Sequence, residues 1–317
     1  GSYNNHWGVP LTLSRMPKET QFGIFEIGMN HPNEIAPLSR LVQPHVVLIT
    51  AIAEAHLEAF ESIIDIAIEK ASVMEGLVEG GFAILNADTR LSYILKNVAN
   101  QIGCGQVWFG KTAKAVRLIN YRRKKGSIII KGNFNGETLS FSLETLGEHF
   151  VLNALATVAA VQALGGHAKN AAADLALWTP EKGRCSIKEI TTSFGKIKII
   201  DDTYNANPAS MTAALDMLGQ VKNARRVAIL GDMLELGTTS EMLHASLSKH
   251  PSLKILDKIH TVGMHMRALH ANLPTLQRGM HFSQAQDLLP YLQELIQKDD
   301  CILVKASNGM GLSLIIN

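Results

Sequence analysis

Residues 196–211 read KIKIIDDTYNANPASM, and this segment is the strongest indication of an α/β fold. Its first five residues alternate in polarity and then become continuously apolar, which predicts a β-strand. Pro208 predicts the start of a helix, because proline fixes φ and lacks an N–H that a first helical turn leaves unpaired. The polar residues in between therefore occupy a loop at the carboxyl end of a strand, where α/β sheets bind their ligands. A polar turn with good helix-capping residues is the plainer alternative.

The composition is that of an ordinary globular chain with two domains. Of the 317 residues, 46% are hydrophobic and 18% are charged, and this length exceeds what a single core usually holds. The net charge of +2 gives no indication of nucleic-acid binding. Cys104, Cys185 and Cys301 lie far apart, so neither a zinc site nor a disulfide framework is expected, and the compartment is expected to be reducing and cytoplasmic. No apolar run approaches the roughly 20 residues of a membrane span.

The first half of the chain alternates between apolar runs of strand length and stretches with helical spacing. This alternation is typical of βαβ units in a mainly parallel sheet. The expected strands cover residues 22–27, 46–49, 82–85 and 107–109, and the expected helices cover 63–77 and 91–102. Shorter alternating runs at 116–119, 127–131 and 138–141 predict an antiparallel appendage, which helices at 150–164 and 170–177 follow.

Residues 179–184, TPEKGR, mark the expected boundary between domains at 1–183 and 184–317. A second α/β pattern follows this boundary and predicts a smaller open sheet with Rossmann-like topology. Its expected strands are 196–200, 226–230, 258–262 and 301–304, and its expected helices are 211–218, 240–248 and 284–296.

Residues 105–112, GQVWFGKT, match the G-x-x-x-x-G-K-[ST] pattern of a phosphate-binding loop. That motif needs a flexible loop whose backbone N–H groups surround phosphate, followed by a helix. Here the interior positions are Gln, Val, Trp and Phe, which favour a strand, and an alternating segment follows Thr112. We therefore predict that this match is accidental.

Three residues near expected strand ends have side chains suited to a metal site. Glu26 supplies a carboxylate, and His56 supplies an imidazole, although each alone is better explained as a surface residue. Lys70 lies in an apolar helix, where an ordinary lysine would extend its charge to solvent. The alternative is that partial burial lowers its pKa. The free amine would then react with carbon dioxide to form a carbamate, which binds Mg²⁺ as a carboxylate does.

Three motifs resemble those of the Mur ligase family, and most closely its MurF type. They are NNHWGVPLTL at residues 4–13, the loop DDTYNANPASM at 201–211, and GDMLELG at 231–237. The resemblance covers nearly the whole chain. It implies a central three-layer αβα ATP-binding domain and a C-terminal Rossmann-like αβα domain. The implied activity is ATP-dependent ligation of D-alanyl-D-alanine to UDP-N-acetylmuramoyl-tripeptide through an acyl phosphate, by a monomer, in peptidoglycan precursor synthesis.

The resemblance also implies roles for individual residues. Glu26, His56 and carbamylated Lys70 would hold Mg²⁺. The implied nucleotide contacts are Asn153, Arg184, Asp202, Tyr204 and Asn205, and the implied contacts to the peptide substrates are Asn4, Asn5, Lys305 and Ser307. The chain departs from the family pattern at Ser72, Phe150, Ala306 and Asn308, where the family often has Glu, Asn, Gly and Arg.

The family's phosphate loop and UDP-sugar-binding domain would precede residue 4, so the chain is expected to begin after them. Two alternatives remain open. One is another amide ligase of the superfamily, such as a diaminopimelate- or lysine-adding Mur enzyme or a folylpolyglutamate synthase. The other is a fragment that keeps the fold but has no activity of its own.

Overall fold

The computed structural model describes residues 3–54, 57–124, 126–192 and 195–316. The chain forms two compact units, each with its own sheet. The first unit comprises Gly1–Lys124, Ile129–Leu143 and Phe150–Leu177, and the second comprises Lys125–Ile128, Glu144–His149 and Trp178–Asn317. This α/β architecture confirms the expected fold class.

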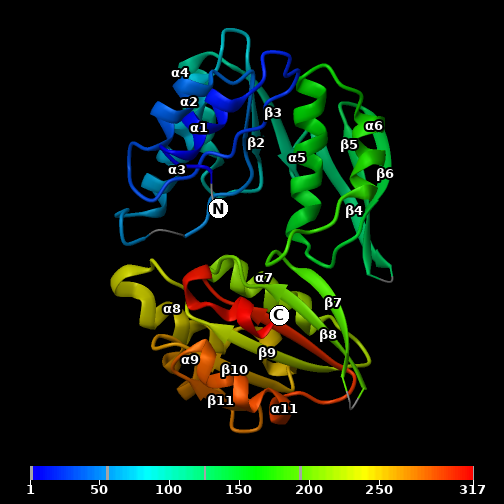
Figure 1. Cartoon of the computed structure of the whole chain (residues 1–317). Helices are drawn as coiled ribbons and strands as arrows, with labels where there is room; N and C mark the ends of the chain where they lie inside the picture. Colours follow the sequence, from blue (N-terminus) through cyan, green and yellow to red (C-terminus); the bar gives the residue numbers. More distant parts are fainter. Residues whose placement is uncertain (1–2, 55–56, 125, 193–194, 317) are drawn as a thin grey trace. The chain divides into compact units, whose positions relative to one another are not determined.

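The sheet of the first unit has six strands in the order β1-β2-β3-β4-β5-β6 (Figure 1). The strands are β1 (Val46–Ile49), β2 (Phe82–Asn86), β3 (Gly105–Gly110), β4 (Val116–Lys124), β5 (Ser127–Phe134) and β6 (Glu137–Leu143). The first four are parallel. Asn135 and Gly136, with φ of 53° and 99°, join β5 to β6, as a type I′ hairpin turn requires. Because such short turns join only antiparallel strands, β5 and β6 are antiparallel. The strand order places them at one side of the same sheet, next to β4.

The helices of the first unit agree with the four predicted ones to within a few residues and include two, at 8–15 and 35–42, that were not predicted. They are α1 (Gly8–Arg15), α2 (Ile35–Val42), α3 (Ile63–Ala71) with η1 (Ser72–Gly76), α4 (Ser92–Ile102), α5 (His149–Ala163) and α6 (Ala168–Asp174) with η2 (Leu175–Leu177). Ser62 caps α3, because its hydroxyl accepts the Asp65 N–H at 3.3 Å. Gly103, in the left-handed conformation, ends α4, which packs against β2.

The strand expected at residues 22–27 is wrong. This segment is extended but belongs to neither sheet. Its apolar side chains do not form a buried face, since Phe22 is 69% exposed and Ile24 is 95% exposed. Strand conformation depends on ladder hydrogen bonds and a covered face, and within the described residues this segment has neither.

The second unit contains a sheet in the order β11-β10-β9-β12-β8-β7. Its strands are β7 (Ser186–Thr192), β8 (Gly195–Asp202), β9 (Arg225–Gly231), β10 (Lys258–Val262), β11 (Arg278–Phe282) and β12 (Asp300–Lys305). All neighbours are parallel except β7 and β8. The four predicted strands are confirmed, whereas β7 and β11 were not predicted. Both are edge strands with alternating burial, which gives a weaker apolar signal.

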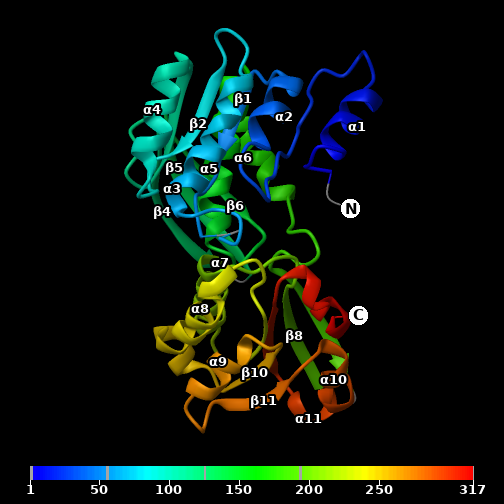
Figure 2. The same ribbon diagram turned by 90° about the vertical axis from the view of Figure 1, so that its left-hand side faces the viewer.

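Helices of the second unit cover the sheet (Figure 2). They are α7 (Pro208–Gly219), α8 (Ser240–Ser246), α9 (Met266–Asn272), α10 (Ala285–Leu288) and α11 (Leu292–Leu295), with short 3₁₀ turns η3 (Gly237–Thr239), η4 (Leu247–Lys249), η5 (Pro251–Ile255), η6 (Leu289–Tyr291), η7 (Asn308–Met310) and η8 (Leu312–Ile315). The single helix expected at 284–296 is wrong. Pro290 lies in η6, between α10 and α11, where its missing N–H interrupts helical hydrogen bonding.

One face of the second sheet packs on a single apolar cluster. Ile199, Ile229 and Val304 point into it together with side chains of α10, α11 and η8. Alternate residues such as Ile200 and Leu303 are also buried and, because strand side chains alternate, face the opposite side. The sheet is therefore covered on both faces, and its ligand-accessible edge is the one formed by the strand carboxyl ends. None of the helices in the described residues is long and apolar enough to cross a bilayer.

Candidate functional site

A buried ion pair links two neighbouring strand ends of the second unit. Lys305 is the last residue of β12, and it lies beside Asp202, the last residue of β8, in the parallel register. Its Nζ donates hydrogen bonds to Asp202 Oδ2 at 2.7 Å and to the Asn205 carbonyl at 2.8 Å. Lys305 is only 1% exposed. Separating two buried charges would leave each without a partner, which is strongly unfavourable. The ion pair therefore fixes the position of the loop after β8.

The turn Lys182-Gly183-Arg184 is attached to the same strand end. Asp201 accepts the Gly183 N–H at 3.0 Å, and the Gly183 carbonyl accepts the Tyr204 N–H at 3.0 Å. Gly183 has φ +78°, and a Cβ there would lie 3.1 Å from Tyr204 backbone and side-chain atoms. Only glycine allows this close approach without strain. Asp201 therefore has a clear structural role in holding the turn.

Arg184 projects from that turn onto an aromatic ring. Its guanidinium carbon lies 4.0 Å from the centre of the Tyr204 ring, which is the geometry of a cation–π contact. The charges of Arg184, Asp202 and Lys305 all act on His149. The structure thus brings together five of the sequence-predicted residues: Arg184, Asp202, Tyr204, Asn205 and Lys305.

Ser307 connects three strand-end loops. Its hydroxyl accepts the Leu234 N–H at 2.9 Å and donates to the Ala206 carbonyl at 3.4 Å, while its own N–H donates to the Asp232 carbonyl at 3.1 Å. These contacts tie the loop after β12 to the loops after β9 and β8. The hydroxyl that the sequence assigns to substrate binding is thus already hydrogen-bonded within the protein.

Sequence reasoning missed two groups at this site. Cys185 is 2% exposed, adopts φ 59°, and lies next to Asp202. Burial, together with the Asp202 charge, raises the pKa of its thiol far above the usual range, so it is not a nucleophile at neutral pH. His149 begins α5 near the same charges. A lone cysteine and a lone histidine carry no signal of such a neighbourhood in sequence.

In the first unit, Asn4 and Glu26 are in contact. Asn4 Nδ2 donates to Glu26 Oε1 at 3.3 Å, and the Asn4 carbonyl accepts the Gly28 N–H at 2.8 Å. A Cβ on Gly28 would lie 2.8 Å from Asn4 Nδ2, so glycine makes room for this carboxamide. Asn5 has a different role. Its Oδ1 accepts the N–H groups of Trp7 and Gly8 at 3.1 and 2.9 Å, which positions the start of α1.

Lys70 lies near the end of α3, and its amine is largely removed from solvent. Burial lowers the pKa of this amine. Within the described residues, the side-chain amine of Lys70 forms neither a hydrogen bond nor an ion pair, with Glu26 or with any other group. The preceding residue, Glu69, instead accepts the N–H groups of Asn33 and Ile35 at 2.8 Å each and so fixes the start of α2. A lowered pKa increases the fraction of the amine that is neutral.

His56 lies outside the described residues, so its position relative to Glu26 and Lys70 is not part of the site described. Among the described residues, no group of three or more His, Cys, Asp or Glu side chains could hold a metal ion. Asn153 lies on α5 and is half-buried; its carboxamide forms no hydrogen bond with a described residue.

The apparent phosphate-binding loop is a strand and its end, as predicted. Gly105–Gly110 form β3. The N–H groups of Lys111 and Thr112 donate to the Asp88 carboxylate at 2.7 and 3.0 Å, and the Thr112 hydroxyl adds a bond at 2.9 Å. These donors therefore already bind an anion of the protein itself.

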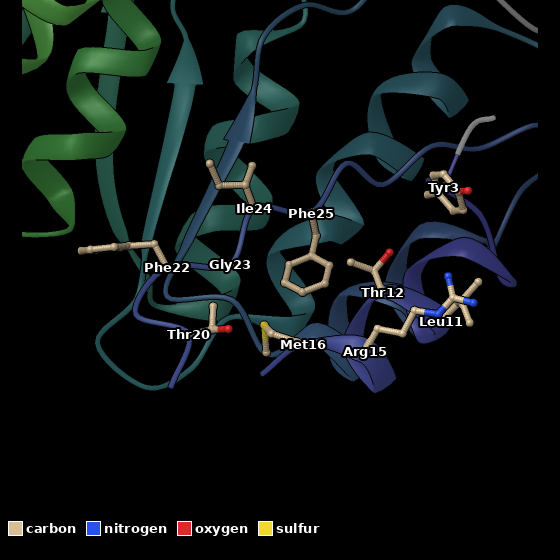
Figure 3. A pocket seen from close by; sticks show the side chains of 10 residues that line it. All are labelled: Tyr3, Leu11, Thr12, Arg15, Met16, Thr20, Phe22, Gly23, Ile24 and Phe25. Atoms are coloured by element: carbon tan, nitrogen blue, oxygen red, sulfur yellow. The ribbon is translucent and has the colours of Figure 1, made fainter. Parts of the chain in front are cut away.

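A shallow groove of 390 Å³ lies beside α1 (Figure 3). It is lined by Tyr3, Leu11, Thr12, Arg15, Met16, Thr20, Phe22, Gly23, Ile24 and Phe25. The ring of Phe25 lies between Thr12 and Met16 in this view, close to Gly23 (Figure 3). The groove is mainly apolar, and Arg15 is the one cation among its lining residues. Its lining residues Tyr3 and Phe25 directly precede Asn4 and Glu26 in the sequence.

Comparison with known proteins assigns both halves of the chain. The sequence profile of the Mur ligase middle domain matches residues 1–161, and that of the Mur ligase, glutamate ligase domain matches residues 183–308. The chain is 31% identical to the UDP-N-acetylmuramoyl-tripeptide--D-alanyl-D-alanine ligase of Rickettsia prowazekii, covering all of this chain and 70% of that protein. It is 34% identical to the ligase of the same name from Bacillus subtilis (strain 168), covering all of this chain and 68% of the relative.

A solved structure agrees with these matches. MurF from Acinetobacter baumannii superposes with a TM-score of 0.89 at 30% identity, over all of this chain and 68% of that one. The middle-domain match extends over half of the chain, and the Rickettsia relative is 31% identical over all of this chain and 70% of its own length. The chain therefore belongs to the Mur ligase family.

Proposed function

We propose that this chain carries the catalytic domains of an ATP-dependent amide ligase of the MurF type, which joins D-alanyl-D-alanine to UDP-N-acetylmuramoyl-tripeptide in peptidoglycan precursor synthesis. The observation that carries the proposal is the cluster of Arg184, Asp202, Tyr204, Asn205 and Lys305 at strand carboxyl ends, in a chain whose relatives bear that name. Cation, carboxylate and aromatic ring in one place match the phosphate, ribose and base of a nucleotide.

Each proposed contact to ATP is assigned to a side chain whose chemistry suits one part of the nucleotide. Arg184 presents a planar guanidinium, which meets phosphate oxygens in a bidentate fashion, and the Tyr204 ring orients it. The Asp202 carboxylate has more acceptor positions than the Lys305 ammonium uses, so it can accept ribose hydroxyls. Asn153 has an unpaired carboxamide among the described residues, which suits the edge of adenine. Tyr204 and Asn205 would contact the nucleotide beside Arg184 and Asp202 in the second unit.

In the first unit, the proposed chemistry begins with Lys70. Its buried amine, with a lowered pKa, would attack the carbon of carbon dioxide, forming an N–C bond and releasing a proton, which leaves a carbamate anion. Glu26, His56 and this carbamate would hold Mg²⁺, an ion that takes few protein ligands and keeps several waters. The bound ion would offset the charge repulsion between a carboxylate and a triphosphate.

In the proposed reaction, the tripeptide carboxylate attacks the γ-phosphoryl group of ATP and gives an acyl phosphate and ADP. The amine of D-alanyl-D-alanine then attacks the acyl carbon, the amide bond forms, and phosphate and a proton leave. The protein mainly positions the reactants and neutralises charge. Asn4, Asn5, Lys305 and Ser307 are the proposed contacts to the peptide substrates. Lys305 and Ser307 already hold the loops at the strand ends in place. Their replacement should therefore weaken substrate binding also indirectly, because those loops would shift.

The test is a ligation assay with competing amines. With ATP and the UDP-tripeptide, we expect ADP release that depends on D-alanyl-D-alanine when the chain is extended at its N-terminus by the family's phosphate loop and UDP-sugar-binding domain. The same extended protein serves for every ligation measurement. Activity with a single amino acid but not with the dipeptide would replace the proposal with another Mur or folylpolyglutamate-type ligase. Titration with a non-hydrolysable ATP analogue separates an inactive fragment that still binds nucleotide from a chain that binds none.

We also place this reaction in the cytoplasm and expect a monomer. The cysteines Cys104, Cys185 and Cys301 are free thiols, which fits a reducing compartment. Sedimentation velocity of the purified protein would test the oligomeric state, and a concentration-dependent dimer would refute the expectation.

A further inference from the structure

The loop Gly231–Gly237 is held by hydrogen bonds from three directions. The Met233 N–H donates to Nε2 of His244 at 2.9 Å. The Leu234 N–H donates to the Ser307 hydroxyl, as described above. The Asp232 carboxylate, which is 3% exposed, accepts the N–H groups of His265 and Met266 at 3.1 and 2.7 Å. One side chain among these partners, His244, changes its hydrogen-bonding character when it gains a proton.

The contacts of His244 specify one tautomer. Nε2 accepts from Met233, so it carries no proton. Nδ1 lies 2.7 Å from the Ser240 carbonyl, which only accepts, so Nδ1 carries the proton and donates it. His244 is completely buried, and its ring stacks on His265 at 5.5 Å between centroids. The neutral Nδ1–H form is therefore the only form that satisfies both neighbours.

Protonation at Nε2 would place two donors face to face and release the Met233 amide. The titratable groups that face the ring are Asp232, directly after β9, and His265, directly before α9. The Asp232 charge favours a proton on His244, whereas burial and His265 oppose it; burial is the largest effect, and the pKa of His244 is lowered. The neutral ring is thus retained at neutral pH and lost in acid.

We propose that His244 is a positioning residue for the ligase: in its neutral Nδ1–H tautomer it holds the Gly231–Gly237 loop in register with the loops that carry Asn205 and Ser307. The link runs from His244 to Met233, then from Leu234 to Ser307, and from Ser307 to the Ala206 carbonyl. Lys305, two residues before Ser307, holds the Asn205 carbonyl. The effect on ligation rests on the proposed function, but the effect on the loop does not.

The first test needs no activity. A long-range ¹H–¹⁵N spectrum of the imidazoles of the whole chain reports which nitrogen of His244 is protonated. We expect the Nδ1–H form at neutral pH, and an Nε2–H form would overturn the proposal. Exchange of the Met233 amide should accelerate about tenfold in His244→Leu, which removes the acceptor, and much less in His244→Gln, which can restore it. Equal exchange in both variants would also overturn it.

The second test measures ligation. The value of kcat/KM should fall about tenfold in His244→Leu and be largely rescued in His244→Gln. The acidic limb of the pH–rate profile should move to lower pH in His244→Gln, because that side chain does not titrate. The exposed His167 supplies the matched control, since His167→Gln should change neither quantity. A normal tautomer with an unchanged pH profile refutes the positioning role alone, whereas absence of ligation in the wild-type protein refutes the proposed function alone.

Discussion

Lys70 is the residue on which the proposed carbamate chemistry depends. Its amine has a lowered pKa, with burial as the cause, and no partner among the described residues. We predict that Lys70→Ala abolishes ligation and that Lys70→Arg does so too, because a guanidinium keeps the charge but forms no stable carbamate. Measurement of initial rates checks this, and Lys96→Ala, at an exposed lysine on α4, is the control. Full activity in Lys70→Ala would remove the carbamate role.

His260 is a second residue whose burial has a measurable consequence. It is 3% exposed, Nδ1 accepts the Met280 N–H at 3.0 Å, and burial lowers its pKa to about 4. The unfolded chain, with the ordinary pKa near 6.5, therefore binds this proton more readily than the folded chain does. The contribution of neutral His260 to the unfolding free energy is fully present above pH 6.5. It is lost as the pH falls toward 4, by about 1.4 kcal/mol per pH unit at most.

Urea unfolding at pH 7 and pH 4.5 measures this contribution of His260. In His260→Asn, whose amide oxygen can still accept the Met280 N–H, we expect a smaller loss of unfolding free energy between the two pH values. His167→Asn should behave as the wild type. If His260→Asn loses as much stability in acid as the wild type, then His260 does not titrate as its burial implies.

At the scale of elements, the GQVWFGKT motif at residues 105–112 can be explained as a phosphate-binding loop or as the end of strand β3. Asp88 accepts three hydrogen bonds from Lys111 and Thr112, including both backbone N–H groups. We predict that Asp88→Ala lowers the unfolding free energy by about 1 kcal/mol, because those exposed donors exchange a charged acceptor for water. Lys111→Ala should leave nucleotide affinity unchanged. Calorimetric titration with an ATP analogue checks the second point, and a marked loss of affinity would restore the phosphate-loop interpretation.

Elements with a strong internal pattern were predictable from the sequence. The helix at 91–102 and the strand at 46–49 have clear periodicities and agree with α4 and β1. The helix start at Pro208 is confirmed with an Asn207–Ser210 capping box. Failures occurred where context determines structure. Residues 22–27 have a strand-like composition but no ladder partner among the described residues. Edge strand β11 gives too weak an apolar signal to stand out.

For the whole molecule, the sequence located the loop after β8 but not the contacts that hold it. Asp202 and Lys305 are 103 positions apart, and only the parallel pairing of β8 with β12 makes them neighbours. The resemblance to Mur ligases supplied both residues without explaining the ion pair. His244 had no signal at all, because a single histidine in a short helix reveals its partners only in three dimensions. Motifs therefore lack information on how strands that are distant in the sequence pair with each other.

The proposed nucleotide site should also appear in the stability of the whole protein. A ligand that binds only the folded state raises the unfolding free energy, by about 2.7 kcal/mol at 100 times its dissociation constant. We predict that an ATP analogue raises Tm and that this shift is lost in Arg184→Ala. It should be mostly lost in Arg184→Lys, which keeps the charge but not the planar fork that stacks on Tyr204. Arg122→Ala, at an exposed arginine on β4, should retain the full shift. Differential scanning calorimetry with and without the analogue measures all four proteins, and a full shift in Arg184→Ala would exclude this arginine from the nucleotide site.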